Sequence, residues 1–232
     1  MTTVVVTGAN RGLGLELARV YAGRGDRVIA GCRNPAAASE LAAIIDHVHA
    51  VDMGDEQSIA TFIEAIGEQA VDVVINNAGI DARNLGASDS ERDVLTQTPE
   101  QLMGQVAVNA VGPWLLSRGL LPQLRRATNP RIVNVTSQIG SMEVGQRIGR
   151  DVGYAVSKAA LNMITVKLAA RLRDEGIVAI VLHPGHLRTD MGGAAAAMEP
   201  ADAARQIVTL VDQLTVADTG TFRRWDGSVH PW

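Results

Sequence analysis

The chain has 232 residues with 25 acidic and 21 basic side chains, and its formal net charge of −4 gives no electrostatic reason to expect nucleic acid or a membrane surface as a partner. Hydrophobic residues make up 47% of the chain, which argues against disorder, and no apolar run reaches the roughly 18 residues of a membrane-spanning helix. A single cysteine excludes internal disulfides and thiolate metal clusters and, with a start that lacks a secretion signal, predicts a cytoplasmic protein.

Short β-branched runs alternate with longer helical stretches along the chain. Strands are expected at residues 4–6, 27–30, 48–51, 71–75, 131–135 and 177–182, with a seventh candidate at 220–223. Helices are expected at residues 13–23, 36–45, 55–67, 99–125 and 154–174. Apolar strands joined by helical crossovers are typical of a sheet that is covered on both faces. The sequence therefore predicts one α/β domain over residues 1–232, a doubly wound (Rossmann-type), mostly parallel sheet of six to seven strands with helices on both faces.

The first strand runs into a turn with three glycines, Thr7-Gly8-Ala9-Asn10-Arg11-Gly12-Leu13-Gly14, which opens an amphipathic helix. Residues without a Cβ allow left-handed backbone angles and let a phosphate approach the amides at the start of the helix, where partial positive charge favours it. An ordinary strand-to-helix turn is the alternative. The position between the first strand and the first helix favours nucleotide binding, because dinucleotide folds bind phosphate there.

The spacing Gly-x-x-x-Gly-x-Gly after Thr7 resembles that of the short-chain dehydrogenase/reductase family, and three later segments resemble the family in the same order. They are Asn76-Asn77-Ala78-Gly79, Tyr154-Ala155-Val156-Ser157-Lys158, and Pro184-Gly185 with Thr189. The segments 189–193 and 218–232 further resemble the C-factor and sniffer-like branch, whose members are carbonyl reductases or developmental signalling proteins. The resemblance implies a nicotinamide cofactor, a small-molecule carbonyl or alcohol substrate, and assembly as a homodimer or homotetramer.

The resemblance also implies which residues bind the cofactor: Gly8, Asn10, Arg11, Gly12, Leu13, Gly14, Met53, Asn77, Ala78, Gly79, Tyr154, Lys158, Pro184, Gly185, Leu187 and Thr189. The second strand ends without the carboxylate that usually holds the adenosine ribose, and Arg33 follows it. Arg33 and Arg11 predict binding of a ribose 2′-phosphate, because guanidinium groups pair well with phosphate; two solvated arginines are the alternative. NADP(H) is the expected cofactor and NAD(H) the alternative. Asp52 resembles the family's adenine-contacting acid, or is the N-cap of the next helix.

Tyr154 and Lys158 are four residues apart on an expected helix and therefore share one face. A free tyrosine, with a pKa of about 10, donates a proton poorly near neutrality, and a nearby ammonium group would lower that pKa by stabilising the phenolate. A surface Tyr/Lys pair is the alternative, and the cofactor motifs upstream argue against it. The resemblance implies that Tyr154 donates the proton in reduction and that Lys158 holds the nicotinamide ribose.

Two further residues resemble members of the family's catalytic set. Ser137 ends the fifth strand and resembles the serine that hydrogen-bonds the substrate oxygen, although Thr136 and Ser141 compete for the role. Asn109 matches the family's helix asparagine. Pro113 lacks the N–H that would bond the Asn109 carbonyl, which favours the hypothesis that this carbonyl holds a water in a proton path to Lys158; a simple helix kink is the alternative.

The catalytic set Asn109, Ser137, Tyr154 and Lys158 predicts NADP(H)-dependent interconversion of a carbonyl and an alcohol. A nucleotide-binding signalling or sensor protein with little turnover is the alternative, and the intact catalytic set argues against it. The histidines lack the carboxylate or thiolate partners of a metal site, so no metal is expected. Loops near 81–98, 141–153 and 186–199 are expected to form the substrate pocket, and the alanines at 194–197 predict that it is open and apolar.

Overall fold

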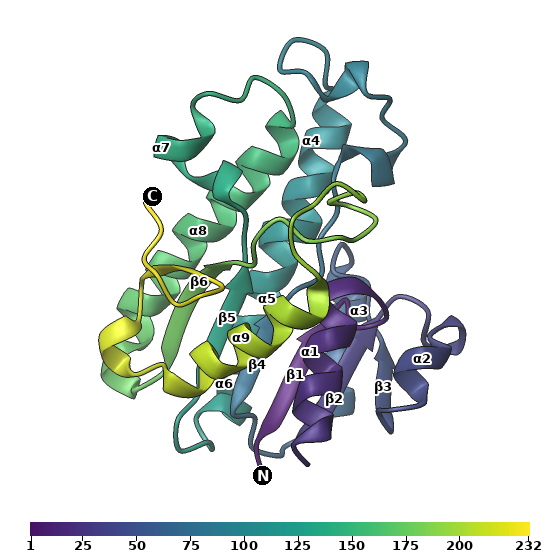
Figure 1. Cartoon of the computed structure of the whole chain (residues 1–232). Coiled ribbons are helices and arrows are strands. Elements are labelled where there is room, and N and C mark those ends of the chain that lie inside the picture. Colours follow the sequence, from purple (N-terminus) through teal and green to yellow (C-terminus); the bar gives the residue numbers. More distant parts are fainter.

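Seven strands form one sheet in the computed structural model, which describes all residues from Met1 to Trp232. The strands are β1 (Thr3–Thr7), β2 (Arg27–Cys32), β3 (His47–Ala50), β4 (Val73–Asn76), β5 (Arg131–Val135), β6 (Val178–His183) and β7 (Phe222–Arg224). Their spatial order is β3-β2-β1-β4-β5-β6-β7, so the chain moves outward from β1 to one edge and then from β4 to the other (Figure 1). Every neighbouring pair is parallel, which confirms the predicted Rossmann-type sheet and its seventh strand.

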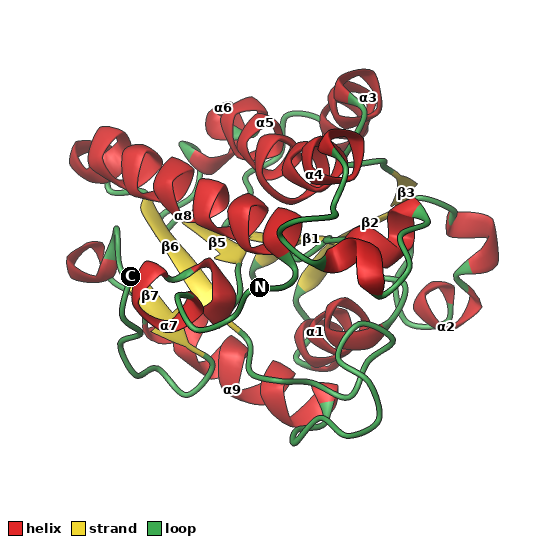
Figure 2. Cartoon of the chain, turned by 90° about the horizontal axis from the view of Figure 1, so that it is seen from above, coloured by secondary structure: helices red, strands yellow, loops and turns green.

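Helices cover both faces of the sheet (Figure 2). On one face, α1 (Gly12–Gly23) packs against α9 (Pro200–Gln213). The other face carries α3 (Glu56–Ile66), α4 (Pro99–Val106), α5 (Gly112–Gly119) and α8 (Val152–Leu172). The short helices are α2 (Ser39–Ala42), α6 (Leu121–Leu124) and α7 (Met142–Gly145). None of the helices is both long and apolar enough to cross a membrane.

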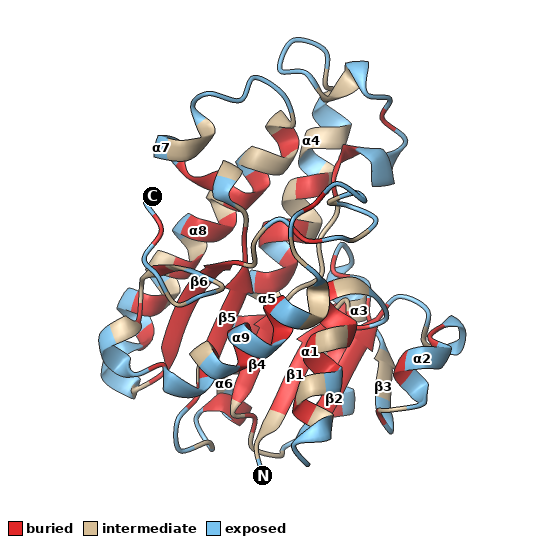
Figure 3. Ribbon diagram, in the orientation of Figure 1, coloured by how far each residue is buried: buried red, intermediate tan, exposed pale blue.

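Alternating side chains on the strands divide the core into two layers. In β1, Val4 and Val6 belong to the layer under α1 and α9, whereas Val5 belongs to the layer under α3, α5 and α8. All three side chains are fully buried, and Figure 3 shows the same burial across the central strands. Because both faces of each central strand are covered, the strands are apolar without alternation, which is the pattern seen in the sequence.

The helix expected at residues 99–125 is interrupted. α4 leads into a π-helical turn, Ala107–Val111, which is followed by α5 and then by α6. Pro113 and Pro122 lack the N–H of a regular helix, and the wider π turn ends two residues before Pro113. Two proline sites therefore divide a segment whose apolar periodicity is continuous.

Two other helices differ from the expectation. The helix expected at residues 36–45 shortens to α2, after a 3₁₀ turn at Pro35–Ala37. The helix α9 was not predicted from the sequence, although its buried residues recur at helical spacing: Ala203, Ala204, Ile207, Val208 and Val211. This apolar face packs on α1 and closes one side of the core.

Gly112 marks a close approach between α5 and the turn after β3. A Cβ at this buried position would overlap the carbonyl oxygen of Met53. We expect Gly112→Ala to lower the free energy of unfolding by about 1–3 kcal/mol, because the backbone must move to remove the overlap. Urea denaturation measures this change.

Gly23→Ala is the matched control for this substitution. Gly23 ends α1, and a Cβ added to it would have no neighbouring atom within 4 Å, so alanine there should raise the free energy of unfolding by about 0.4–1 kcal/mol. Equal effects of the two substitutions would contradict the close approach at Gly112.

Candidate active site

A cavity of about 1420 Å³ opens at the carboxyl ends of the strands, where the strand order reverses between β1 and β4. Open α/β sheets bind their ligands at this position. Most of the predicted site residues line the cavity: Gly8, Asn10, Arg11, Gly12, Leu13, Arg33, Asp52, Met53, Asn77, Ala78, Gly79, Ser137, Tyr154, Lys158, Pro184, Gly185, Leu187 and Thr189. Two predicted residues, Gly14 and Asn109, do not line it.

The glycine-rich turn forms a cradle of backbone at one end of the cavity. Gly8 has a φ of +65°, and a Cβ on it would lie 2.8 Å from the Cα of Ala78, so a larger residue fits neither the angle nor the space. A Cβ on Gly14 would overlap the carbonyl oxygen of Gly8. Gly14 therefore packs behind the turn and does not face the cavity. Asn77 Nδ2 donates to the carbonyl oxygens of Thr7 and Gly8 at 3.0 and 3.2 Å, and this joins the turn to the segment after β4.

The start of α1 is open to an anion. No side chain caps the helix at Arg11, and its first turn contains no acidic residue. The free N–H groups and the helix dipole therefore present partial positive charge to the cavity. A cradle of glycine backbone beside such a helix start fits the pyrophosphate of a dinucleotide.

The two arginines expected at the ribose of the cofactor differ from each other in their contacts. Arg33 follows β2, lines the cavity and is exposed. Arg11 also lines the cavity, but it forms an ion pair with Asp190, which was not predicted from the sequence. β1 and β2 are adjacent parallel strands, so the turns that carry the two arginines are neighbours. This places two cations on one side of the cavity.

Asp52 lines the cavity after β3 and accepts a hydrogen bond from the Gly54 N–H at 2.8 Å. The next helix, α3, is instead capped by Asp55, whose carboxylate accepts from the Gln57 N–H at 2.9 Å. The alternative interpretation of Asp52 as the N-cap is therefore wrong, because α3 begins three residues later than that role requires.

Three hydrogen bonds hold α8 against the sheet, and they come from consecutive residues: the last two of β5 and Thr136 directly after it. The pairs are Asn134 Nδ2 to Thr165 Oγ1 (2.8 Å), Lys158 Nζ to the Val135 carbonyl oxygen (2.8 Å) and Thr136 Oγ1 to Asn162 Oδ1 (2.7 Å). Lys158, Asn162 and Thr165 lie one above another on a single buried face of the helix. Asn162 and Thr165 were not among the predicted residues, although their polar character at this spacing from Lys158 was an available signal.

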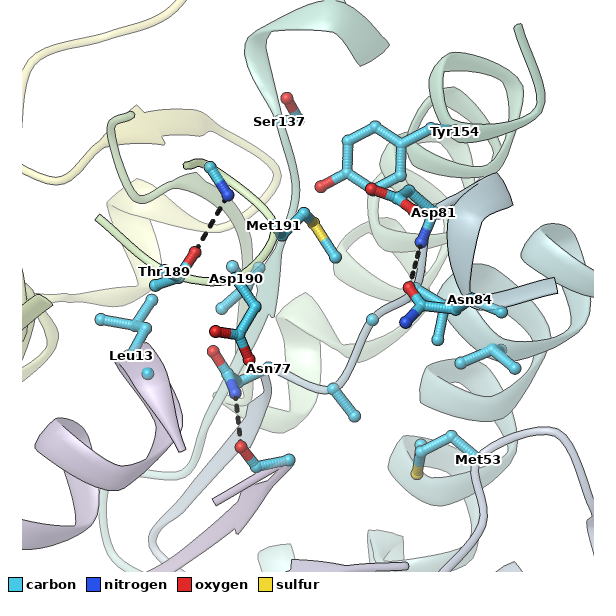
Figure 4. Close-up of a pocket in the computed structure, with 18 of the residues that line it drawn as sticks. Leu13, Met53, Asn77, Asp81, Asn84, Ser137, Tyr154, Thr189, Asp190 and Met191 are labelled. Carbon is cyan, nitrogen blue, oxygen red and sulfur yellow. Dashed lines mark hydrogen bonds between the residues drawn. The ribbon is translucent and has the colours of Figure 1, made fainter. Parts of the chain in front are cut away.

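Tyr154 and Lys158 both reach the cavity from the same face of α8, and Figure 4 shows the Tyr154 ring there. Lys158 Nζ lies 5.5 Å from the centroid of that ring. Burial lowers the pKa of Lys158 to about 8. Burial also raises the pKa of Tyr154, and the carboxylates of Asp81 and Asp151 raise it further. The expected lowering of the Tyr154 pKa by Lys158 is therefore not seen: burial and the two carboxylates raise it, and the Lys158 ammonium group donates to the Val135 carbonyl instead.

Ser137 faces the cavity two residues after the end of β5 and caps the 3₁₀ turn that follows it. The two competing hydroxyl groups are engaged elsewhere. Thr136 donates to Asn162 on α8, and Ser141 is buried and accepts from the Val144 N–H at 3.1 Å. Among the three candidates, Ser137 has the hydroxyl that is best placed to meet a ligand.

Asn109 is fully buried in the π turn and acts through other residues. Its side chain exchanges two hydrogen bonds of 2.8 Å with the main chain of Ile80 and donates to Ser157 Oγ at 2.9 Å. Ser157 Oγ donates in turn to the Tyr154 carbonyl at 2.8 Å. Asn109 thus joins the segment after β4 to α8. A water at its main-chain carbonyl stays a prediction.

The wall beside Tyr154 is charged, which was not predicted from the sequence. Arg83 pairs with Asp81, and Arg92 pairs with Asp151, each at 2.6 Å. All four residues line the cavity, and Figure 4 shows Asp81 beside the Tyr154 ring. The alanines at 194–197 do not line the cavity, so the prediction that these residues make the pocket apolar is wrong.

Comparison with known proteins identifies a family. The sequence model of the short chain dehydrogenase family matches residues 2–200. The curated relatives include C-signal of Myxococcus xanthus, which is 35% identical over 162 residues that cover 70% of this chain and 93% of the relative.

Solved structures show the same relationship. The NADPH-bound carbonyl reductase from chicken fatty liver is 28% identical, with a TM-score of 0.89 over 100% of this chain and 99% of the other. The carbonyl reductase Sniffer of D. melanogaster is also 28% identical, with a TM-score of 0.90 over 100% of both chains. The resemblance to the C-factor and sniffer-like branch that the sequence predicts is therefore confirmed.

Burial of the Lys158 ammonium group predicts a pH dependence of the free energy of unfolding. The pKa of Lys158 is about 8 in the folded protein and ordinarily 10.5, so the unfolded chain binds this proton more tightly. The resulting destabilisation is complete below about pH 8 and disappears as the pH rises to 10.5. We expect Lys158→Met to raise the free energy of unfolding by roughly 1–3 kcal/mol at pH 7, and this gain to shrink between pH 8 and pH 10.5. Urea denaturation across this pH range measures it.

Lys167→Met is the matched control, because Lys167 is on the same helix and exposed. Its effect on the free energy of unfolding should be small and constant from pH 7 to pH 10.5. A Lys158→Met protein that is less stable than the parent at pH 7 would contradict the cost assigned to the buried ammonium group.

Proposed function

The chain belongs to the short-chain dehydrogenase family, and on this premise we propose that it is an NADP(H)-dependent oxidoreductase that interconverts a carbonyl and an alcohol, with Tyr154 as the general acid and base. One observation carries the proposal. A single cavity joins the glycine cradle at the start of α1 to the side chains of Ser137, Tyr154 and Lys158. A nucleotide bound in the cradle and a substrate beside Tyr154 would therefore share one space.

The residues of the cavity fit a nicotinamide dinucleotide. The turn at Gly8 and the uncapped start of α1 suit its pyrophosphate, and the Asn77–Gly79 segment faces them across the cavity. In this proposal Lys158 holds the nicotinamide ribose, and Thr189 with the Pro184-Gly185 turn seats the carboxamide; all four residues line the cavity. When bound, the cofactor supplies the hydride.

Tyr154 provides the proton of the reduction. Burial and the neighbouring carboxylates raise its pKa, so the phenol is protonated near neutrality and available as the acid, although it releases that proton less readily than a free tyrosine. Ser137 holds the substrate oxygen next to it. In the reverse direction the same phenol must lose its proton, and the positive charge of Lys158 and of an oxidised nicotinamide would favour that loss.

NADP(H) is the preferred cofactor in this proposal. β2 ends at Cys32 without a carboxylate, and Arg33 follows as an exposed cation on the cavity wall. A guanidinium group at this position favours a 2′-phosphate, whereas an unphosphorylated ribose would gain nothing from it. The carbonyl reductase from chicken fatty liver, which has the same fold, was solved with NADPH bound.

The substrate is a small carbonyl compound or alcohol that carries polar groups. Asp81, Arg83, Arg92 and Asp151 surround the position next to Tyr154, and a wholly apolar substrate would desolvate them without compensation. We further propose a homodimer or homotetramer. The neighbouring helices α4, α5 and α8 carry exposed apolar side chains suited to a subunit contact: Met103, Trp114, Val156 and Met163.

Similarity to C-signal favours a second candidate function, a nucleotide-binding signalling or sensor protein with little turnover. Such a protein would need the glycine cradle but not the Ser137, Tyr154 and Lys158 side chains. Their convergence in one cavity supports the enzyme over this alternative.

Tyr154→Phe tests the proposed acid. We expect turnover to fall by at least about 100-fold, because phenylalanine has no proton to donate, while the affinity for NADPH is kept. The measurement is NADPH absorbance with a panel of aldehydes and ketones, together with a fluorescence titration of NADPH.

The control is Tyr21→Phe, which changes the other tyrosine of the chain. Tyr21 is buried in α1 and its hydroxyl has no hydrogen-bond partner, so activity should be unchanged. Full activity of Tyr154→Phe would remove the proposed role. A parent protein that binds NADPH but turns over no member of the panel would favour the sensor.

Arg33→Ala tests the cofactor preference. Removing the guanidinium group should raise KM for NADPH by about 10-fold and leave KM for NADH unchanged, because only NADPH carries the 2′-phosphate. Arg27→Ala, at the opposite end of the same strand, is the matched control and should change neither value. Equal changes for NADPH and NADH would speak against a phosphate contact at Arg33.

A further inference from the structure

Residues 186–199, which we call the strap, form a loop between β6 and α9 that closes on itself at its base. The Arg188 N–H donates to the Met198 carbonyl at 2.9 Å, and the Met198 N–H donates to the His186 carbonyl at 3.2 Å. Arg188 also pairs with Glu199 at 2.6 Å. The base is therefore held independently of the cavity, which leaves the tip to make separate contacts.

The tip of the strap is tethered to both sides of the cavity. On one side, Arg83 Nη2 donates to the Met191 carbonyl at 2.9 Å. On the other, Asp190 pairs with Arg11 of the glycine-rich turn. Thr189 packs there as well, since a Cβ on Gly12 would lie 3.2 Å from its Cγ2. The strap thus spans the cavity between the substrate end and the cofactor end.

The carboxylate of Asp190 lies where an anion is favoured. Figure 4 shows its side chain extending toward Asn77 and Leu13, on the side of the cavity that holds the cradle. Arg11 stands at the uncapped start of α1, so its guanidinium group and the helix dipole attract negative charge to the same place. In the structure, the Asp190 carboxylate occupies this position and pairs with Arg11.

We propose that Asp190 is an internal competitor for the phosphate groups of the dinucleotide: it engages Arg11 in the nucleotide-free protein and gives it up when the nucleotide binds. This inference rests on the proposed function, because it requires a nucleotide in the cradle. Asp190 is then a residue that sets cofactor affinity from outside the cofactor-binding motifs. A second consequence is mechanical, since nucleotide binding frees one of the two tethers of the strap and keeps the tether at Arg83.

The competition is weak enough to be reversible. The side chains of Arg11 and Asp190 are 58% and 77% exposed, and such ion pairs contribute little because water and salt screen them. The 2′-phosphate, and the pyrophosphate taken as a whole, carry more negative charge than one carboxylate and match its bidentate hydrogen bonding to arginine, so either group displaces Asp190. Removal of the competitor should tighten nucleotide binding by about two- to five-fold.

The test is a set of dissociation constants measured by calorimetry with NADP⁺ and with NAD⁺. Asp190→Asn should lower Kd for NADP⁺ by about two- to five-fold, and the same substitution in an Arg11→Gln background should have no effect. Glu199→Gln is the matched control, because it removes a carboxylate and an ion pair from the base of the strap without touching Arg11. It should leave both dissociation constants unchanged.

Comparison of NADP⁺ with NAD⁺ shows which phosphate group competes with Asp190, because only NADP⁺ carries the 2′-phosphate. A gain for NADP⁺ alone assigns the competition to the 2′-phosphate, and an equal gain for NAD⁺ assigns it to the pyrophosphate; both support the proposal. An unchanged or weaker affinity of Asp190→Asn, or a gain that persists without Arg11, overturns it. A parent protein that binds neither nucleotide overturns the proposed function as well, an outcome distinct from normal binding without an effect of Asp190.

Discussion

The attachment of α8 to β5 is the constraint on which the candidate active site depends. Three consecutive residues, Asn134, Val135 and Thr136, each hold one polar side chain of the helix, and all the bonds are buried. A buried donor or acceptor that loses its partner destabilises the fold by more than the hydrogen bond stabilised it. Sliding or rotation of α8 is therefore opposed at three points. The position of Tyr154, one turn before Lys158, follows from this attachment.

The site is assembled at the expense of stability. Lys158 is buried with its charge facing a carbonyl group, and burial beside two carboxylates disfavours the ionised form of Tyr154. Asp151 precedes α8 with a φ of +61°, and it is the one residue other than glycine with a positive φ. Arg92 holds it there through an ion pair and a main-chain hydrogen bond of 2.6 Å. Strained and desolvated groups of this kind are retained where they serve a function.

Local patterns account for the parts of the protein that are predicted well from its sequence. The buried strands show as short β-branched runs, and the close backbone approach at Gly8 and Gly14 requires glycine. A kink at Pro113 was one of the alternatives that the sequence left open, but the division of the helix into α4, a π turn, α5 and α6 was not predicted. The apolar periodicity continues through Pro113, and only the packing around the π turn decides where the helical hydrogen bonds widen. The charged wall was missed for another reason: Asp81 and Asp151 belong to different loops, and neither has a motif.

The order of strands and helices, the glycine turn and the Tyr154/Lys158 pair are all encoded locally, because backbone periodicity and short spacings set which neighbours share a strand, turn or helix face. The meeting of distant side chains is settled by the folded chain alone. Arg11 and Asp190 are 179 positions apart, and Asn109 reaches both Ile80 and Ser157. Such pairs depend on the order of the strands in the sheet and on the paths of the loops that leave them, and no local period encodes either.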